Sequence, residues 1–218
     1  MNDPMPSSST RASSESENAT RERILDVAVE EFSSKGFGSV RIDSIAARAN
    51  ANKQLIYYYF SSKSGLYDAV LDRLVDTYRP VWAAMREGTL DDMIRLRAQQ
   101  ARGSITWRRL LAWEGLEYWE NRDNPIHRED IRKAAYDSQR EVLEHAQQSG
   151  TFPAEVDARF ASLLLIFASL GPAAFPQITK LVTGLEPDDP AVADGVDQVI
   201  AALLARTSED QRPSGPSQ

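Results

Sequence analysis

The chain has 218 residues, a formal net charge of −7 and no cysteine, which excludes a disulfide framework, a thiolate metal site and a cysteine nucleophile. The overall acidity does not exclude a nucleic-acid partner, because charges act over about one Debye length, roughly 8–10 Å in salt. Residues 35–63 hold five Lys or Arg and one acid, a local balance of +4, whereas residues 81–218 hold 15 basic and 21 acidic residues.

The N-terminal segment, residues 1–17, is rich in Ser and Pro and has no apolar run of the kind found in signal peptides. We therefore predict a disordered tail and expect a cytoplasmic protein. A first helix follows, in which one stripe of apolar residues repeats at helical spacing: Ile24, Leu25, Ala28, Val29 and Phe32. Gly36 suits the left-handed position that ends such a helix.

Residues 41–63 predict two short helices joined by a tight turn. Apolar residues at i, i+3, i+4 and i+7 define the first of them: Ile42, Ile45, Ala46 and Ala49. Asn50 tolerates the positive φ of a turn, and Asn52 is a good N-cap for the second helix, whose buried stripe is Ile56 and Phe60. The segment is typical of a helix-turn-helix, whose second helix enters a DNA major groove.

The exposed residues of that second helix have the chemistry of nucleic-acid contact. Lys53 and Gln54 occupy its first turn, nearest the base edges when such a helix docks. Lysine donates to guanine, and glutamine pairs with adenine. Tyr58 shares the face of Gln54, and Leu55 either touches a thymine methyl or packs inward. Packing between helices is the alternative explanation for the tyrosines, and we expect it for part of one ring.

The remainder of the chain again shows helical patterns. Ser62 caps a fourth helix that runs toward Pro80, and further helices are predicted over about 89–102, 104–122, 127–149, 155–174 and 189–206. No stretch alternates with period two for long enough to indicate a strand, so the predicted fold class is all-α. The run Phe160–Leu170 is apolar almost all round but far too short to span a membrane.

Residues 20–74 resemble the DNA-binding domain of the TetR family of bacterial transcriptional regulators. The matching segments are TRERILDVAVEEFSSKGF, IDSIAARA and NKQLIYYYFSSKSGLY. The resemblance implies a three-helix DNA-binding domain with a helix-turn-helix over 18–66. It also implies a helical ligand-binding and dimerisation domain over 67–206, reached through the fourth helix, and we expect a disordered tail over 207–218.

The resemblance also implies functional residues. Those expected to contact DNA are Arg41, Ser44, Lys53, Gln54, Leu55, Tyr57, Tyr58, Tyr59 and Lys63, with Tyr57, Tyr59 and Lys63 reaching phosphates. Members of this family usually dimerise through their last two long helices, which places Leu164, Phe167, Val196, Ile200 and Leu203 at the dimer interface. The plainer interpretation, that both helices only fill one core, fits the composition equally well.

A ligand site is the least defined part of the sequence. Trp113, Glu117 and Tyr118 lie close together on one predicted helix, and aromatic faces beside a carboxylate can hold a lipophilic cation. The plainer interpretation, which we favour for any single residue, is that the aromatics are core and the acids solvated. His127 and His145 have no clustered partner ligands, so we expect no metal site and no cofactor.

Together with the resemblance, these patterns predict a transcriptional regulator, more often a repressor, that binds a palindromic operator as a homodimer. The resemblance implies that a small molecule releases it from the operator. Two rival functions are open. A helical-bundle enzyme would need a Ser/His/Asp set, a metal site or a phosphate loop, none of which is evident. A ligand-independent architectural or adaptor protein of the same fold would lack a cavity in the C-terminal domain.

Overall fold

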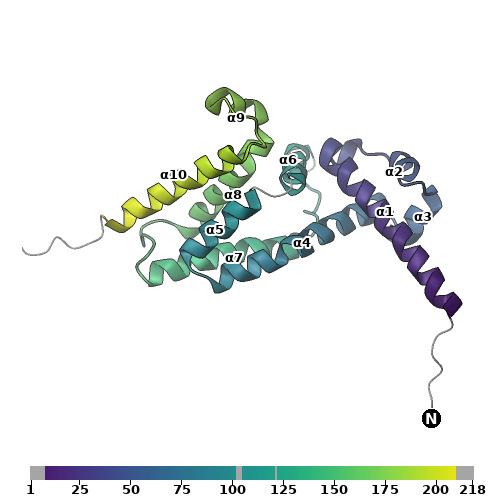
Figure 1. The fold of residues 1–218 in the computed structure, drawn as a ribbon, viewed down its shortest axis with the longest axis horizontal. Coiled ribbons are helices and arrows are strands. Elements are labelled where there is room, and N and C mark those ends of the chain that lie inside the picture. The colour runs from purple at the N-terminus through teal and green to yellow at the C-terminus, as the bar shows by residue number, and fades with distance from the viewer. Residues whose placement is uncertain (1–7, 102–104, 121, 210–218) are drawn as a thin grey trace, which may run out of the picture. The chain divides into compact units, whose positions relative to one another are not determined.

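The computed structural model describes residues 8–101, 105–120 and 122–209, and their regular elements are ten α-helices without a strand (Figure 1). The N-terminal unit comprises the residues up to Arg73 together with Trp113–His127, and the C-terminal unit comprises Leu74–Ala112 and the residues from Arg128 onward. The predicted all-α fold with two parts is confirmed.

The N-terminal unit contains α1 (Ser8–Ser39), α2 (Ile42–Arg48), α3 (Lys53–Phe60) and the start of α4 (Lys63–Glu87). Helices α1, α2 and α3 pack against one another around fully buried apolar side chains, among them Ile24, Phe32, Ile45, Ile56 and Leu66. Phe32 also meets the Tyr67 ring edge-on, at 5.0 Å between centroids. The apolar stripes predicted for the first three helices are therefore the core of this unit.

The start of the first helix differs from the prediction, whereas its end agrees with it. Helix α1 begins at Ser8, so residues 8–17 are helical and not part of a disordered tail. The reason is that no Pro or Gly interrupts the chain between Pro6 and Gly36, so the helix continues outward from its packed portion. At the other end, Gly36 has φ 76° and ψ 166°, which confirms the predicted break.

The C-terminal unit is built from α5 (Leu90–Ala101), α7 (Glu129–Gln148), α8 (Ala158–Ala174), α9 (Pro176–Thr183) and α10 (Pro190–Glu209), with parts of α4 and α6 (Thr106–Tyr118). Within it α7 packs on α5 and α8, and α10 packs on α5 and α8 (Figure 1). Its core includes Met85, Met93, Leu143, Phe152 and Leu165.

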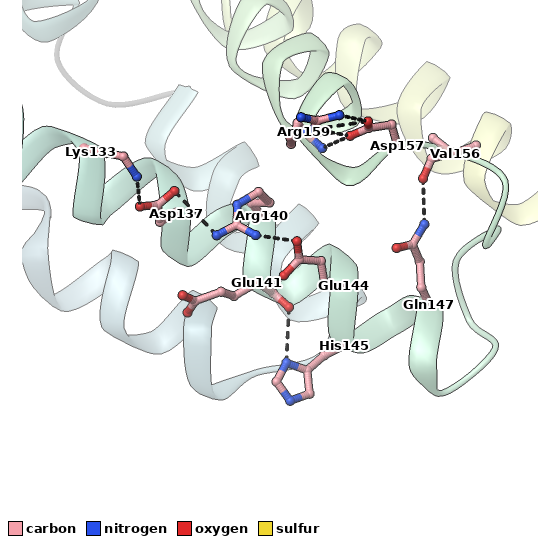
Figure 2. A network of polar contacts seen from close by, with 10 residues as sticks. All are labelled: Lys133, Asp137, Arg140, Glu141, Glu144, His145, Gln147, Val156, Asp157 and Arg159. Carbon is pink, nitrogen blue, oxygen red and sulfur yellow. Dashed lines mark hydrogen bonds and ion pairs between the residues drawn. The ribbon is translucent and has the colours of Figure 1, made fainter.

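Polar contacts fix the exposed side of α7 and its connection to α8 (Figure 2). Lys133, Asp137, Arg140 and Glu144 form a ladder of ion pairs at helical spacing. The amide of Gln147 donates to the carbonyl oxygens of Pro153 and Val156, at 2.8 and 2.6 Å, and so closes the loop. Asp157 then caps α8, accepting from the Arg159 backbone N–H.

Helix α9 is an element that the sequence did not predict. Pro176 stands in its first turn and Gly184 ends it with φ 76°, two signals that mark a short helix. Two further boundaries move: α6 ends at Tyr118 and not near 122, and α10 extends to Glu209, three residues into the predicted C-terminal tail. The rest of that tail, 210–218, lies outside the described residues.

Across the described residues, no single helix is both long and apolar enough to cross a membrane. Helices α8 and α9 meet that test of length and composition only when taken together, across a bend of 91°.

Candidate nucleic-acid interface and ligand cavity

The turn between α2 and α3 has the geometry that the sequence predicts. Asn50 adopts φ 46°, and the backbone N–H of Ala51 donates to Ala46 O at 2.9 Å, which closes the end of α2. The Asn52 side chain then accepts from the backbone N–H of Leu55 at 2.8 Å and caps α3. The two helices therefore form a helix-turn-helix, as predicted.

A buried carboxylate orders this arrangement. Glu31 on α1 is 2% exposed and accepts from Lys35 at 2.7 Å, Arg48 at 2.6 Å and Ser44 at 3.3 Å. Burial pushes the pKa of the Glu31 carboxyl upward, but the hydrogen bonds from Lys35 and Arg48 outweigh it and hold that pKa below its ordinary value. The Glu31 cluster (Glu31, Lys35, Ser44, Arg48) thus ties α2 to α1.

The sequence analysis did not identify Glu31, although a signal was present. Glu31 falls on the apolar stripe of the first helix, next to Phe32, with a lysine four residues on. Ser44, predicted to contact DNA, donates its hydroxyl to this carboxylate. A second tie comes from Arg23, whose Nε donates to Ala49 O at 2.7 Å, at the end of α2.

The outer face of α3 carries the predicted DNA-contacting side chains. Tyr58 is 73% exposed and Tyr57 43%, while Lys53 and Gln54 are also exposed. Leu55 and Tyr59 are half-buried, and the Tyr58 and Tyr59 rings meet at 5.2 Å. Part of one tyrosine ring therefore packs between neighbours, as expected, and most of the aromatic surface faces solvent.

Lys53 is not a free cation in this structure. Its Nζ lies 2.9 Å from Asp43 Oδ1, and the hydrogen bond to Asp43 raises the pKa of the ammonium group. Lys63 donates to Gly38 O at 3.2 Å and lies 4.6 Å from the centre of the Phe37 ring. Arg41 is exposed and has no ion pair to any described residue.

The C-terminal unit contains a cavity of about 100 Å³, here called the aromatic cavity. Its walls come from α4, α5, α6, α7 and α8, and most of them are aromatic or aliphatic. The lining residues are Tyr78, Trp82, Met85, Arg97, Gln100, Trp107, Arg108, Leu111, Ala135, Tyr136, Ser138, Gln139, Ile166, Ser169 and Leu170.

A neighbouring hollow of about 190 Å³ shares three wall residues with the aromatic cavity, Arg97, Arg108 and Ser169. Arg97 is 4% exposed, pairs with Asp197 on α10 and donates to Ser169 Oγ on α8 at 2.7 Å. Burial lowers the pKa of both guanidinium groups, and for Arg97 the nearby charge of Asp197 opposes this shift. Neither arginine was singled out from the sequence, since a buried cation has no local signature.

The residues predicted to hold a ligand lie elsewhere. Trp113 and Glu117 belong to the N-terminal unit and are not in the wall of the aromatic cavity. Glu117 Oε1 accepts from the backbone N–H of Gly38 at 2.8 Å, and the Trp113 ring lies beside Gly36. Tyr118 is 45% exposed and stacks edge-on with Trp119. The predicted ligand cluster therefore lies apart from the aromatic cavity and stays a prediction, because a local face of one helix cannot show which unit it packs on.

His127 illustrates the same division of the chain. Its Nδ1 lies 2.7 Å from Asp68 Oδ1, and its ring contacts Phe37 and Tyr67 at about 5 Å, all within the N-terminal unit. The N-terminal unit thus extends to Arg73 and includes Trp113–His127, whereas the sequence analysis places the domain boundary at residues 66 and 67. The described residues hold no group of three His, Asp or Glu suited to a metal ion.

The predicted dimer residues divide between two faces. Leu164, Phe167 and Leu203 are 56–67% exposed. Val196 and Ile200 are instead half-buried, since they continue the stripe of buried Val192 toward the inside of the unit. Helix α8 presents a further apolar stripe at i, i+3, i+4 and i+7, formed by Phe160, Leu163, Leu164 and Phe167. The outward side of α10 is continued by Val199, which is 60% exposed.

Known proteins resemble this chain over both units. Residues 24–70 match the family described as "Bacterial regulatory proteins, tetR family". The HTH-type transcriptional repressor SCO4008 of Streptomyces coelicolor is 32% identical over 169 residues, which cover 76% of this chain and 84% of that protein.

Two solved structures have the same fold. The ketosteroid transcriptional regulator KstR2 of Mycobacterium tuberculosis matches with a TM-score of 0.63 and 17% identity, over 86% of this chain and 93% of that one. FadR of Bacillus subtilis in complex with stearoyl-CoA matches with a TM-score of 0.58 and 17% identity, over 83% and 97%. With its helix-turn-helix, its second helical unit and a relative similar along most of its length, the chain belongs to the TetR family of DNA-binding transcriptional regulators.

Proposed function

We propose that this protein is a repressor that binds a palindromic operator as a homodimer and leaves it when a small molecule enters the aromatic cavity. The observation that carries the proposal is the placement of this cavity. Its wall includes Tyr78, Trp82 and Met85 from α4, and Trp107, Arg108 and Leu111 from α6. Those two helices also supply residues to the N-terminal unit.

The DNA-binding part of the proposal rests on the face of α3. Lys53 and Gln54 read base edges in the major groove, with Tyr58 beside them, and Leu55 lies next to this face. Arg41, Tyr57, Tyr59 and Lys63 contact phosphates. Ser44 acts mainly through Glu31, which keeps α2 in place behind the recognition helix. Repression agrees with the function named for SCO4008.

The dimer part rests on the exposed apolar stripe of α8 and the outer face of α10. Soluble monomers rarely leave so many neighbouring apolar side chains in water. A second copy of the chain is the occupant that helix-turn-helix recognition requires, because a palindromic site presents two identical half-sites about 34–36 Å apart. Leu164, Phe167 and Leu203 are exposed enough to pack against their counterparts.

The release part rests on the shared helices. A ligand in the aromatic cavity contacts the C-terminal half of α4 and the first half of α6. The other end of α6 is held to the DNA-binding unit by the hydrogen bond from Gly38 to Glu117. FadR, which has this fold, is in complex with stearoyl-CoA, so the fold accommodates a small molecule.

Footprinting of the DNA that flanks the protein's own gene tests the proposal. We expect a protected site with two-fold symmetry, two half-sites one helical turn or a multiple apart, and occupancy that rises with the square of monomer concentration below the dimerisation constant. Protection of a single asymmetric half-site by a monomer would contradict the dimer. Protection without any sequence preference would favour the architectural or adaptor alternative.

A further inference from the structure

The aromatic cavity also indicates what kind of molecule it takes. Its apolar wall includes the rings of Trp82 and Trp107 with Leu111 and Ile166. Its volume of about 100 Å³ is somewhat below that of an apolar cavity of about 150 Å³ that binds benzene. The apolar part of the ligand is therefore about one aromatic ring or a short aliphatic chain.

The charge of the wall is unbalanced. It contains two arginines, Arg97 and Arg108, and no Asp or Glu. Arg97 forms an ion pair with Asp197, which compensates its charge. Arg108 is half-buried, forms no ion pair or hydrogen bond with any described residue, and its Nε is shielded from solvent without a partner. Asp188, Asp189 and Asp197 share the wall of the neighbouring hollow with Arg108, but none of them forms an ion pair with it.

A half-buried guanidinium that is not bound to an anion favours carboxylates over other groups, because its planar fork matches two oxygens. We infer that the ligand of the aromatic cavity is a small organic anion, with its ring or short chain against Trp82 and Trp107 and its carboxylate on Arg108. This inference rests on the proposed function for the ligand's role as effector. It reverses the charge expected from the Trp113 and Glu117 pattern.

The position of Arg97 links this anion to the rest of the unit. Arg97 on α5 holds Ser169 on α8 and Asp197 on α10, so it joins three helices next to Arg108. A carboxylate on Arg108 introduces a second negative charge beside the Arg97–Asp197 pair. The pair then weakens or rearranges, and α10 is one of the two helices proposed to form the dimer.

Three probes that share one ring and differ in charge test the inference: benzoate, benzamide and benzylammonium. Binding to the full-length protein is measured by quenching of tryptophan fluorescence and by the shift in Tm. Because hydrogen bonds to charged groups are stronger than neutral ones, we expect benzoate to bind about tenfold or more tightly than benzamide. We expect benzylammonium to bind weakest. Equal or tighter binding of benzamide or benzylammonium would overturn the inference.

Variants of adjacent residues localise the effect. Arg108→Gln should weaken benzoate about tenfold or more and remove the preference for the anion. Arg109 lies on the same helix but is exposed and outside the cavity wall. Arg109→Gln should therefore leave the benzoate affinity and the preference for the anion unchanged. Arg108→Lys keeps the positive charge but lacks the planar fork, so its benzoate affinity should lie between those of the parent and Arg108→Gln. This variant also tests the site if Arg108→Gln does not fold. Unaltered benzoate affinity in Arg108→Gln, or no binding of benzoate or butanoate at millimolar concentration, would contradict the site.

Electrophoretic mobility shift with operator DNA separates this inference from the proposed function. If an acid binds through Arg108 but leaves the operator complex intact, the anion site stands and its role as effector site fails. If a neutral apolar compound releases the operator equally well from the parent protein and from Arg108→Gln, effector release stands and the anion site is wrong.

Discussion

At the start of α3, Asp43 and DNA compete for the Lys53 ammonium group. The two side chains are both exposed and form an ion pair at 2.9 Å. In the proposed complex with DNA, Lys53 exchanges the Asp43 carboxylate for a base edge, and Asp43 turns away from the phosphates. In this proposal the pair holds the Lys53 ammonium group at the start of α3 while neutralising it, which lowers the attraction to DNA of arbitrary sequence.

Replacing Lys53 or Gln54 by Ala should weaken operator binding about 5- to 100-fold and relax sequence preference, since each removes a contact to a base edge. Lys63→Ala should weaken all sequences about equally and lower the salt slope by about one unit. Asp43→Asn should tighten non-specific binding. Binding titrations at several salt concentrations on operator and scrambled DNA distinguish these effects. Footprints of the Lys53 and Gln54 variants identical to that of the parent would show that the recognition face is misplaced.

Glu31 predicts how the N-terminal unit responds to acid. Its pKa in the folded state is below the ordinary value of about 4.3, so the ionised carboxylate stabilises the fold at neutral pH. This stabilisation is complete above the unfolded-state pKa and is lost as the pH falls through the lower folded-state pKa. Urea unfolding at pH 7 and at pH 3 should therefore show a steeper loss of stability for the parent than for Glu31→Gln.

At neutral pH, Glu31→Gln should destabilise the unit by about 1–2 kcal/mol, because it weakens hydrogen bonds to charged partners that are themselves half exposed. Glu30→Gln is the matched control, since Glu30 is exposed and binds only the same Arg48. An equal effect of the two substitutions would mean that burial of Glu31 is unimportant.

Helix α8 is apolar on two sides, and only one of them packs against other described residues of the chain. Ala158, Ser162 and Leu165 are buried against the rest of the C-terminal unit. Phe160, Leu163, Leu164 and Phe167 form the opposite stripe and remain exposed. A helix that is hydrophobic all round is normally buried all round, and this supports the proposal that a second copy of the protein covers the stripe.

Leu164→Glu and Leu203→Glu should each yield a folded monomer with weak operator affinity, because a carboxylate in the dimer interface is unpaired and costly. Sedimentation and far-UV circular dichroism measure assembly and folding. Gln198→Glu places the same charge on an exposed position of α10 and should leave the dimer intact. A parent protein that stays monomeric at micromolar concentration, with and without DNA, would remove the dimer from the proposal.

At the scale of the molecule, two helices are shared between the units. Helix α4 belongs to the N-terminal unit up to Arg73 and to the C-terminal unit from Leu74, and α6 changes unit between Ala112 and Trp113. A ligand shifts the protein between states only by binding one state better. Moving a population from 1:99 to 99:1 requires about 5.5 kcal/mol, or less than about 3 kcal/mol for each of two cavities in a dimer.

Thermodynamic linkage makes this coupling measurable from either side: operator DNA should weaken effector binding by the factor with which the effector weakens operator binding. Calorimetric titration with and without operator tests it. Glu117→Gln, which loosens α6 from Gly38, should reduce the coupling while leaving effector affinity of the free protein unchanged. Glu120→Gln, at an exposed position beyond α6, is the control. Equal effector affinity with and without operator would refute release through these helices.

The sequence alone determined the helix-turn-helix and the all-α fold. Asn50, Asn52 and Ser62 act through contacts within a few residues, and the stripes of Ile24, Phe32 and Ile56 fix which face of each helix is buried. Local chemistry and helical periodicity suffice for such features, since every interaction that they need lies within one or two turns.

Only the tertiary structure decided which unit each later segment joins and where the aromatic cavity lies. Trp113 and Glu117 resemble a binding face in sequence, yet they pack on Gly36 and Gly38, about 75–80 residues earlier in the chain. Arg97 and Asp197 are 100 residues apart and meet inside the C-terminal unit. Helical periodicity shows that a face is apolar, but it does not show what covers that face. Pairing over such separations depends on how all the helices pack together, which no local pattern encodes.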